Sequence, residues 1–375
     1  MNDILILPIR DAKDRDTFLE FPWKVYSGDP LWVPPLLGER AKLIDPRKGP
    51  FFAHGQAEFF VAWRDDKPVG TICTAIDDEL NQARGLKECV FGFFECIEDA
   101  AVARALFDFA RSWAGSHGQE WLYGPFNLDY EDAYGVLIEG WEQPPALLCG
   151  HSPPYYRPFF EDYGFLPARG DNLAYALDLI DNPAIDPLSR MAERVRRQRN
   201  FTIRGGQFDH WEQEIDLIYP LINAALAHLP DTRPWPRETL QHLFAPFRKI
   251  ADPDLILMAE DGDRLIGFLP GIPNLNEALI HANGLRRPWD YLTLWRWLRR
   301  PAACLAIKSV LVYPEYWGSG VAILLFDEMA KRARAKGYRW LDLSLTSADN
   351  PRTPVLAERF GGRVYKRYRV YRLKI

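Results

Sequence analysis

IKSVLV (residues 307–312), YPEYWGSG (313–320) and VAILLFDEMAKRARAK (321–336) follow one another without a break. The first segment is a short apolar run bounded by turn residues, which predicts a buried strand. The third segment has apolar side chains at helical spacing and basic side chains between them, and Gly337 follows as a stop. Its apolar positions are Ala322, Leu325, Phe326, Met329 and Ala333. The stretch therefore predicts a strand, a glycine loop and a helix.

The loop between this strand and helix is suited to an anion. Gly318-Ser319-Gly320 leaves backbone N–H groups uncovered where the helix dipole favours negative charge. Glycines at these positions could also form only a tight turn. The Gly-Lys-Ser/Thr of a P-loop does not follow, and a GxGxxG motif would need glycine where Ile323 stands. We therefore expect a phosphate that is held by neither of these nucleotide-binding motifs.

Strand and helix signals occur twice in the same order. A predicted hairpin at residues 58–75 precedes a strand at 89–96 and a helix at 99–116, and a hairpin at 255–269 precedes the strand and helix described above. Proline and short polar residues from Asp181 to Pro187 separate the two copies. We place the domain boundary near residue 180, which gives domains 1–180 and 181–375. One continuous sheet shared by both halves is the alternative.

The segment Trp317-Gly318-Ser319-Gly320-Val321-Ala322 resembles motif A of the GNAT acyltransferases, which is Gln/Arg-x-x-Gly-x-Gly/Ala after a strand. Asn350 and the ending at 357–362 extend the likeness. Residues 312–321, 341–350, 361–371 and 30–36 also resemble a group of bacterial proteins with two GNAT-like halves. The resemblance implies an α/β fold of two tandem GNAT-like units, each a mixed, mostly antiparallel sheet flanked by helices. The second unit would carry the acyl-CoA site.

The resemblance also implies an N-acyltransferase that moves an acetyl or longer acyl group from acyl-CoA directly to a primary amine. The donor would lie on Val310, Leu311, Val312, Trp317, Gly318, Ser319, Gly320, Val321, Ala322 and Asn350, with its pantetheine beside the strand and its pyrophosphate on the loop. This chain departs from the family in two places. Trp317 stands at the Gln/Arg position of the motif, and Ala357 stands where many GNAT enzymes have a tyrosine that acts as a general acid.

On the acceptor side, alternation along the strand LDLSLT (341–346) places Asp342 and Ser344 on one face. They are candidates for proton transfer or for structural hydrogen bonds, and Tyr368, Tyr365 or a water could replace the missing acid. Asn274 and Asn276 are candidates for binding the substrate or for forming a turn. In the first half, residues 93–99 place bulky and acidic groups where a phosphate would lie. We expect that half to be a degenerate copy that shapes the acceptor cleft.

Composition limits the partners. The 375 residues carry a net charge of −5, which predicts no general attraction to DNA or to anionic membranes. The seven histidines and five cysteines show no metal-binding spacing, so we expect no metal and reduced thiols. No signal peptide pattern opens the chain, which predicts a cytoplasmic protein. The resemblance implies a small-molecule or peptide amine as its acceptor.

Two basic stretches, 194–199 and 295–300, leave tRNA binding as a less favoured possibility. The alternative functions are therefore a non-catalytic acyl-CoA-binding or scaffold protein and a Fem-like transferase that uses aminoacyl-tRNA.

Overall fold

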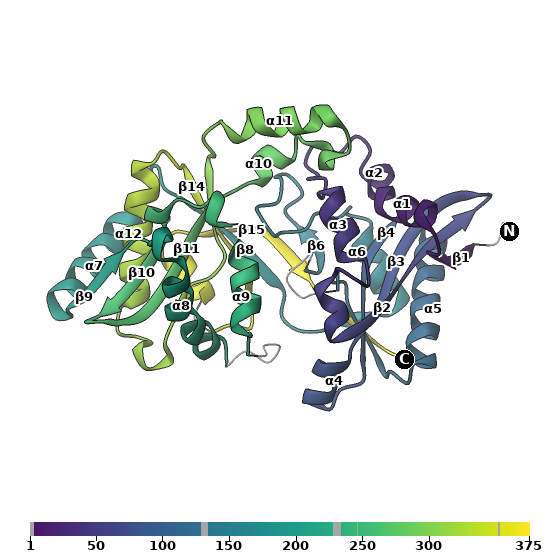
Figure 1. The fold of residues 1–375 in the computed structure, drawn as a ribbon, viewed down its shortest axis with the longest axis horizontal. Helices are drawn as coiled ribbons and strands as arrows, with labels where there is room; N and C mark the ends of the chain where they lie inside the picture. Colours follow the sequence, from purple (N-terminus) through teal and green to yellow (C-terminus); the bar gives the residue numbers. More distant parts are fainter. Residues whose placement is uncertain (1–3, 129–133, 228–233, 246, 352) are drawn as a thin grey trace.

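The chain forms two mixed sheets, each flanked by helices, in a computed structural model that describes residues 4–128, 134–227, 234–245, 247–351 and 353–375 (Figure 1). In both sheets one neighbouring pair is parallel, β4 with β5 and β12 with β14, and the other pairs are antiparallel. The predicted fold class is thereby confirmed, and the alternative of one continuous sheet is not what the structure shows.

The first sheet has seven strands. Their order is β1 (Leu5–Pro8), β2 (Gly55–Arg64), β3 (Lys67–Asp77), β4 (Glu88–Cys96), β5 (Trp121–Gly124), β16 (Tyr371–Lys374) and β7 (Leu166–Pro167). The helices of this half are α1 (Ala12–Glu20), α2 (Pro22–Val25), α3 (Leu37–Leu43), α4 (Asp78–Arg84), α5 (Ala100–Ser116) and α6 (Tyr156–Tyr163). The α5 helix buries Val102, Leu106 and Phe107 in the core of this half, because they recur at helical spacing.

The second sheet has nine strands. Eight run in the order β6 (Val136–Glu139), β15 (Arg363–Arg369), β8 (Asn172–Asp178), β14 (Trp340–Ser347), β12 (Cys304–Ile307), β11 (Arg264–Pro273), β10 (Ile256–Asp261) and β9 (Phe201–Arg204), and β13 (Leu311–Val312) pairs with β11. Its helices are α7 (Ile185–Gln198), α8 (Trp211–Leu226), α9 (Arg237–Phe244), α10 (Asn276–Leu279), α11 (Pro288–Leu298), α12 (Val321–Ala335) and α13 (Thr353–Arg359). The predicted strand, glycine loop and helix are β12–β13, the turn before residue 321, and α12.

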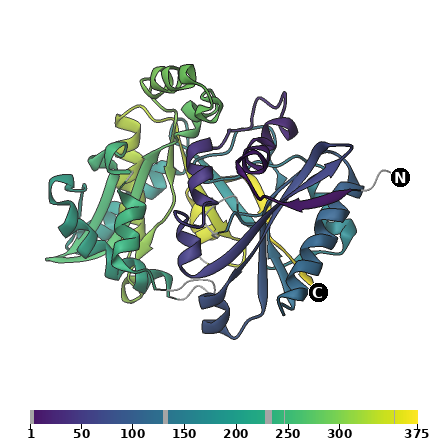
Figure 2. The same ribbon diagram turned by 45° about the vertical axis from the view of Figure 1, so that its right-hand side comes forward.

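The two halves exchange strands. β6 and β8 precede residue 180 but belong to the second sheet, whereas the C-terminal β16 lies between β5 and β7 of the first sheet. Figure 2 shows the yellow C-terminal segment passing from one half into the other. A chain cut at residue 180 would separate strands that are paired here, and the two-domain boundary remains a prediction.

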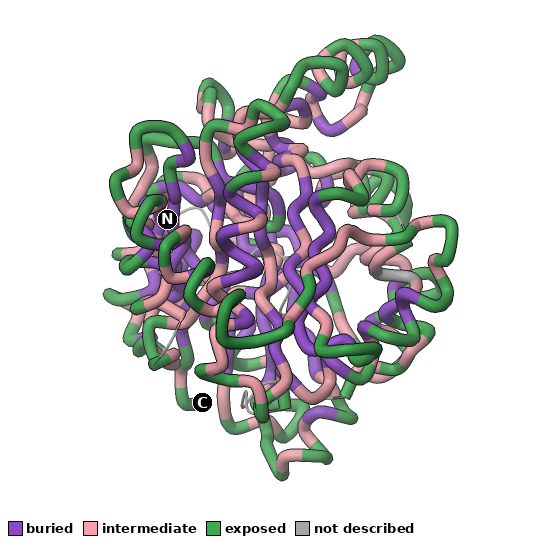
Figure 3. The backbone as a smooth tube through the Cα atoms, turned by 90° about the vertical axis from the view of Figure 1, so that its left-hand side faces the viewer, coloured by how far each residue is buried: buried purple, intermediate pink, exposed green. Residues whose placement is uncertain are grey.

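The segment between β11 and β12 forms an arm that contains α10 and α11. This arm projects from the top of the molecule in Figure 1, and in Figure 3 it is mostly exposed while the strands beneath it are buried. Among the described residues, no helix is both long and apolar enough to cross a bilayer.

Candidate active site

A β-bulge opens the second sheet where the sequence predicts the donor strand. β12 pairs with β11 up to Ile307, and β13 resumes that pairing at Leu311. Residues 308–310 therefore face only two residues of β11, Leu269 and Pro270, which is the count of a bulge. On the other side, β14 pairs with β12 as far as Leu343 but has no pairing with β13. The two neighbouring strands consequently diverge after the bulge.

The divergence leaves one edge of β13 without a partner strand. Tyr313 N donates to Ile266 O at 3.2 Å, so alternation directs the amide and carbonyl of Val310 and Val312 towards the opposite, open edge. Trp317 lies on this edge, and its indole Nε1 donates to Val312 O at 3.0 Å. The tryptophan that departs from the family motif therefore already occupies one carbonyl of the predicted pantetheine strand.

The loop that follows presents bare amides at the N-terminus of α12. Within the described part of the chain, the amides of Gly318, Gly320, Val321 and Ala322 donate no hydrogen bond, whereas Ser319 N and Oγ both donate to Tyr316 O. Gly318 and Gly320 have φ values of +79° and +98°, a region that favours glycine. No side chain caps this helix. The four free amides and the positive end of the helix dipole are features that favour an anion at this position.

The equivalent helix of the first half is closed to an anion. Asp99 caps α5 by accepting a hydrogen bond from Ala101 N, and its second oxygen accepts one from Arg64 at 2.7 Å. The bulge of this half, at Phe93 with φ +46°, is also satisfied, since Asn127 accepts from its amide and Thr71 donates to its carbonyl. A carboxylate thus occupies the N-terminus of α5.

Asn350, the remaining predicted donor-binding residue, lies at the start of α13. Its Oδ1 accepts a hydrogen bond from Thr353 N at 3.0 Å, which is the geometry of a helix cap.

Asp342 and Ser344 meet a lysine where β12 and β14 diverge. Lys308, the first residue of the bulge, donates to Asp342 Oδ2 at 2.8 Å and to Ser344 Oγ at 2.9 Å. Ser344 donates to Asp342 Oδ2 at 2.6 Å, and Tyr365 donates to Asp342 Oδ1 at 2.8 Å. Asp342 is fully buried and both of its oxygens accept hydrogen bonds. The cluster favours the structural alternative for Asp342, because both of its oxygens are already occupied by hydrogen bonds within the protein.

The charges of this cluster follow from its burial. Burial alone would lower the pKa of Lys308, but the negative charge of Asp342 outweighs it and the pKa is raised. Burial and the charge of Asp342 also raise the pKa of the Tyr365 phenol. Lys308 is therefore an ammonium and Tyr365 a neutral phenol at pH 7.

Cys149 brings the first half of the chain to the cluster. Its Sγ lies 3.1 Å from Ser344 Oγ and 3.8 Å from Lys308 Nζ. Burial raises the pKa of this thiol although Lys308 acts in the opposite direction. The sequence analysis missed Lys308 and Cys149. A lysine inside an otherwise apolar strand was the visible signal for the first, and nothing in the sequence places Cys149 beside residue 344.

The other predicted residues lie around this cluster. Tyr368 is buried and donates to Gly150 O at 2.9 Å, without a hydrogen bond to Asp342. Asn274 Oδ1 accepts from Leu147 N at 2.9 Å, and Asn276 Nδ2 donates to Ala146 O at 2.9 Å. Both asparagines thus hold the backbone of the segment that carries Cys149, Asn274 through its amide oxygen and Asn276 through its amide nitrogen.

A second lysine is buried beside the same segment. Lys366 has no solvent exposure, and its Nζ donates to Gly140 O. Burial lowers its pKa to about 8. A buried amine of this kind can exchange a proton near neutral pH.

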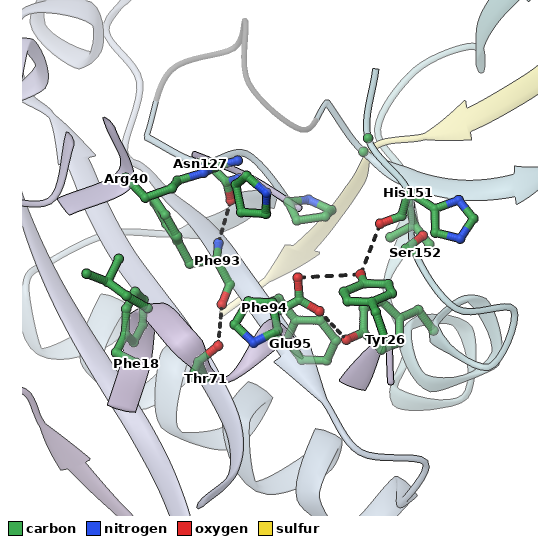
Figure 4. A pocket seen from close by; sticks show the side chains of 18 residues that line it. Phe18, Tyr26, Arg40, Thr71, Phe93, Phe94, Glu95, Asn127, His151 and Ser152 are labelled. Carbon is green, nitrogen blue, oxygen red and sulfur yellow. Dashed lines mark hydrogen bonds between the residues drawn. The ribbon is translucent and has the colours of Figure 1, made fainter. Parts of the chain in front are cut away.

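The first half contains a cavity of about 100 Å³ next to this segment (Figure 4). Its wall includes Glu95, Tyr26, Tyr156 and the backbone of residues 150–152, which directly follow Cys149. Tyr156 donates to Glu95 Oε2 at 2.7 Å. Tyr26 Oη lies 3.0 Å from His151 O and 3.4 Å from Glu95 Oε1. One hydroxyl hydrogen cannot serve both acceptors fully.

Protonation of Glu95 would supply the second hydrogen that the contact between Tyr26 and Glu95 needs. Burial raises the pKa of Glu95 to about 7, and the tyrosine hydrogen bonds only partly oppose this. A protonated Glu95 can donate to the Tyr26 oxygen while Tyr26 donates to His151 O. Residues 146–152 thus connect the Lys308 cluster with this polar cavity.

A bulged strand that leads into a helix, beside a parallel strand, is the arrangement of an acyltransferase-type fold, and it occurs in both halves. The helix N-terminus is uncapped in the second half and capped by Asp99 in the first. No group of three or more metal-ligating side chains is found among the residues that the structure describes.

Comparison with known proteins agrees with this class. Residues 219–361 match the family described as Acetyltransferase (GNAT) family. The chain is 28% identical over 378 residues to a bacterial ceramide synthase of Caulobacter vibrioides, covering 98% of this chain and 97% of the relative. It is also 28% identical over 377 residues to Protein YghO of Escherichia coli, covering 99% and 95%.

A solved tandem GNAT protein from the clavulanic acid biosynthesis pathway shares the fold. Its TM-score is 0.59 at 13% identity, over 99% of this chain and 98% of that one. Residues 219–361 therefore match the GNAT family, and the chain as a whole shares the fold of a protein with two GNAT halves.

Proposed function

We propose that the C-terminal half transfers an acyl group from acyl-CoA to a primary amine. The observation that carries this proposal is the contrast between the two helix N-termini. The glycine loop before α12 leaves four amides free, whereas α5 is capped by Asp99. The free amides before α12 can bind the diphosphate of an acyl-CoA, and the bulge before β13 leaves room beside the strand for its thioester.

The residues divide the work in this proposal. The amides of 318 and 320–322 hold the pyrophosphate, and Asn350 supports the neighbouring helix end. The open edge of β13, at Val310 to Val312 with Leu311 between them, aligns the pantetheine. The donor supplies an activated thioester, whose acyl carbon the amine attacks as the thiol leaves. In this proposal, amides of the bulge donate to the carbonyl oxygen of that thioester.

The acceptor side is organised by the Lys308 cluster. Asp342 and Ser344 fix Lys308, and Tyr365 fixes Asp342. Ser344 and Lys308 together contact Cys149, which carries the 146–152 segment towards β14. A water or the neutral form of Lys366 takes the proton that the acceptor's ammonium must lose before its amine attacks. Because the name of the Caulobacter relative describes the synthesis of a ceramide, an amide of a long-chain amino alcohol, long-chain amines are the first acceptors to test.

A charge placed on the loop tests the donor site. A Cβ on Gly318 would meet no atom within 4 Å, whereas one on Gly320 would lie 2.5 Å from Val195 Cγ2. Aspartate and asparagine both tolerate the positive φ of residue 318, so Gly318→Asp and Gly318→Asn differ only by one negative charge. We expect the aspartate variant to bind acyl-CoA about tenfold more weakly than the asparagine variant in a thermal-shift titration. Equal affinities would remove the loop from the donor site.

A second candidate function is non-catalytic binding of acyl-CoA, which Trp317 on the strand edge favours. Thiol release by wild-type protein, followed over short and long acyl-CoA donors with a panel of amines, separates the two candidates. Tight binding without thiol release for any amine would favour the binder. A thermal shift with aminoacyl-tRNA, and none with acyl-CoA, would instead favour the Fem-like alternative.

A further inference from the structure

The outer face of α11 is a surface of large apolar side chains. Trp289, Tyr291, Leu292, Trp295 and Leu298 are between 49% and 60% exposed. They occupy one short helix, which Figure 3 shows projecting from the body of the molecule. We call these five residues the α11 apolar face. Exposed aromatic groups concentrated in this way mark an interaction site.

The opposite side of α11 is anchored to the protein. Trp297 stacks on His281 with ring centroids 3.6 Å apart, and buried Asp290 accepts a hydrogen bond from Arg287 N at 2.9 Å. The helix also packs against α10 and the turn at 283–285. The arm therefore holds α11 in place, and the apolar face is directed away from these contacts.

The arm is strongly basic although the chain is acidic. Residues 286–300 contain five arginines and one aspartate, a local net charge of +4 by subtraction, in a chain whose net charge is −5. Arg299 lies 3.7 Å from the centre of the Trp295 ring and Arg300 lies 3.8 Å from that of Trp297. Aromatic, leucine and arginine side chains on one helix match what an interfacial helix presents to anionic lipid.

We propose that the α11 apolar face docks on the surface of an anionic phospholipid membrane. The tryptophans, Tyr291 and the leucines enter the boundary between head groups and acyl chains, and Arg296, Arg299 and Arg300 pair with lipid phosphates, whereas Arg286 is already paired with Glu20. The overall net charge, from which we expected no membrane partner, conceals this local patch.

A nucleic acid fits the face less well. Stacked bases need free aromatic ring faces, but arginines already cover Trp295 and Trp297. Exposed Leu292 and Leu298 gain nothing from a nucleic acid, whereas lipid removes them from water. The docking proposal stands independently of the proposed acyl transfer.

Sedimentation with vesicles tests the docking. Wild-type protein is mixed with vesicles of phosphatidylcholine alone or of phosphatidylcholine with phosphatidylglycerol. We expect partition onto the anionic vesicles that weakens as salt is raised. Leu292→Glu/Trp295→Glu should reduce the partition coefficient by about tenfold or more, since it removes two apolar anchors and adds two negative charges.

The matched control is Leu5→Glu/Leu7→Glu, which makes the same charge change at two exposed leucines of β1. It should sediment like wild type. Melting temperatures and the acyl-CoA thermal shift of both variants report folding and the donor site separately. The proposal is overturned if wild type does not bind anionic vesicles, or if the α11 variant binds them as well as wild type. Binding of tRNA by wild type, without binding of vesicles, would also overturn it.

Discussion

At the scale of single residues, the raised pKa of Glu95 predicts that the stability of the fold depends on pH. Its pKa is about 7 in the folded protein, against an ordinary value of 4.5. Between these two values the folded state binds the proton more tightly than the unfolded chain does. The free energy of unfolding therefore falls as pH rises from about 4.5 to about 7, and the ionisation of this group lowers it by at most about 3 kcal/mol.

Glu95→Gln removes this dependence, because the amide keeps a donor towards Tyr26 and does not titrate. We expect the variant to gain stability relative to wild type between pH 5 and pH 8, measured by urea unfolding at each pH. Glu98→Gln, which removes an exposed carboxylate of the same segment, is the matched control for the change of charge and is measured in the same way. A difference between Glu95→Gln and wild type that is constant with pH would contradict the assignment.

Sequence alternation predicted the shared face of Asp342 and Ser344, and the structure places both in one cluster. It did not predict that Lys308 and Tyr365 would occupy the oxygens of Asp342. Those contacts join strands that are distant in the chain, and a strand pattern specifies which face a side chain takes but not which strand becomes its neighbour.

At the scale of elements, the packing of α7 against the glycine loop predicts a specific coupling. A Cβ on Gly320 would lie 2.5 Å from Val195 Cγ2, and φ is +98°. Gly320→Ala should cost about 2 kcal/mol, from backbone strain and from the clash. Val195→Ala should recover about 1 kcal/mol of this in the double variant, which a double-mutant cycle by chemical denaturation measures.

Gly318→Ala supplies the control for this cycle. Its φ of +79° imposes similar strain, but a Cβ there meets nothing within 4 Å. Its effect should add to that of Val195→Ala without coupling. If Gly320→Ala also proves additive with Val195→Ala, then α7 does not restrict the loop.

Periodicity was sufficient to predict the strand, loop and helix, since each type of element has its own spacing of apolar residues. Periodicity does not predict the bulge at residues 308–310. It arises because three residues face Leu269 and Pro270, and such a register depends on the partner strand.

At the scale of the whole molecule, the duplicated order of signals predicted two similar units, and the structure contains two sheets of similar topology. The exchange of strands was not predictable in the same way. β6, β8 and β16 have the apolar patterns of ordinary strands, and only packing decides which sheet each one joins.

This exchange predicts that the halves cannot fold separately. Residues 1–180 lack β16, whose Tyr371 is fully buried and stacks on Phe160, and residues 181–375 lack β6 and β8, which flank β15. Each fragment expressed alone should show no cooperative thermal transition. Expressed together they should copurify and melt in one transition, because a cut at residue 180 interrupts no strand. A cooperative transition in either fragment alone would mean that its sheet is stable without the exchanged strands.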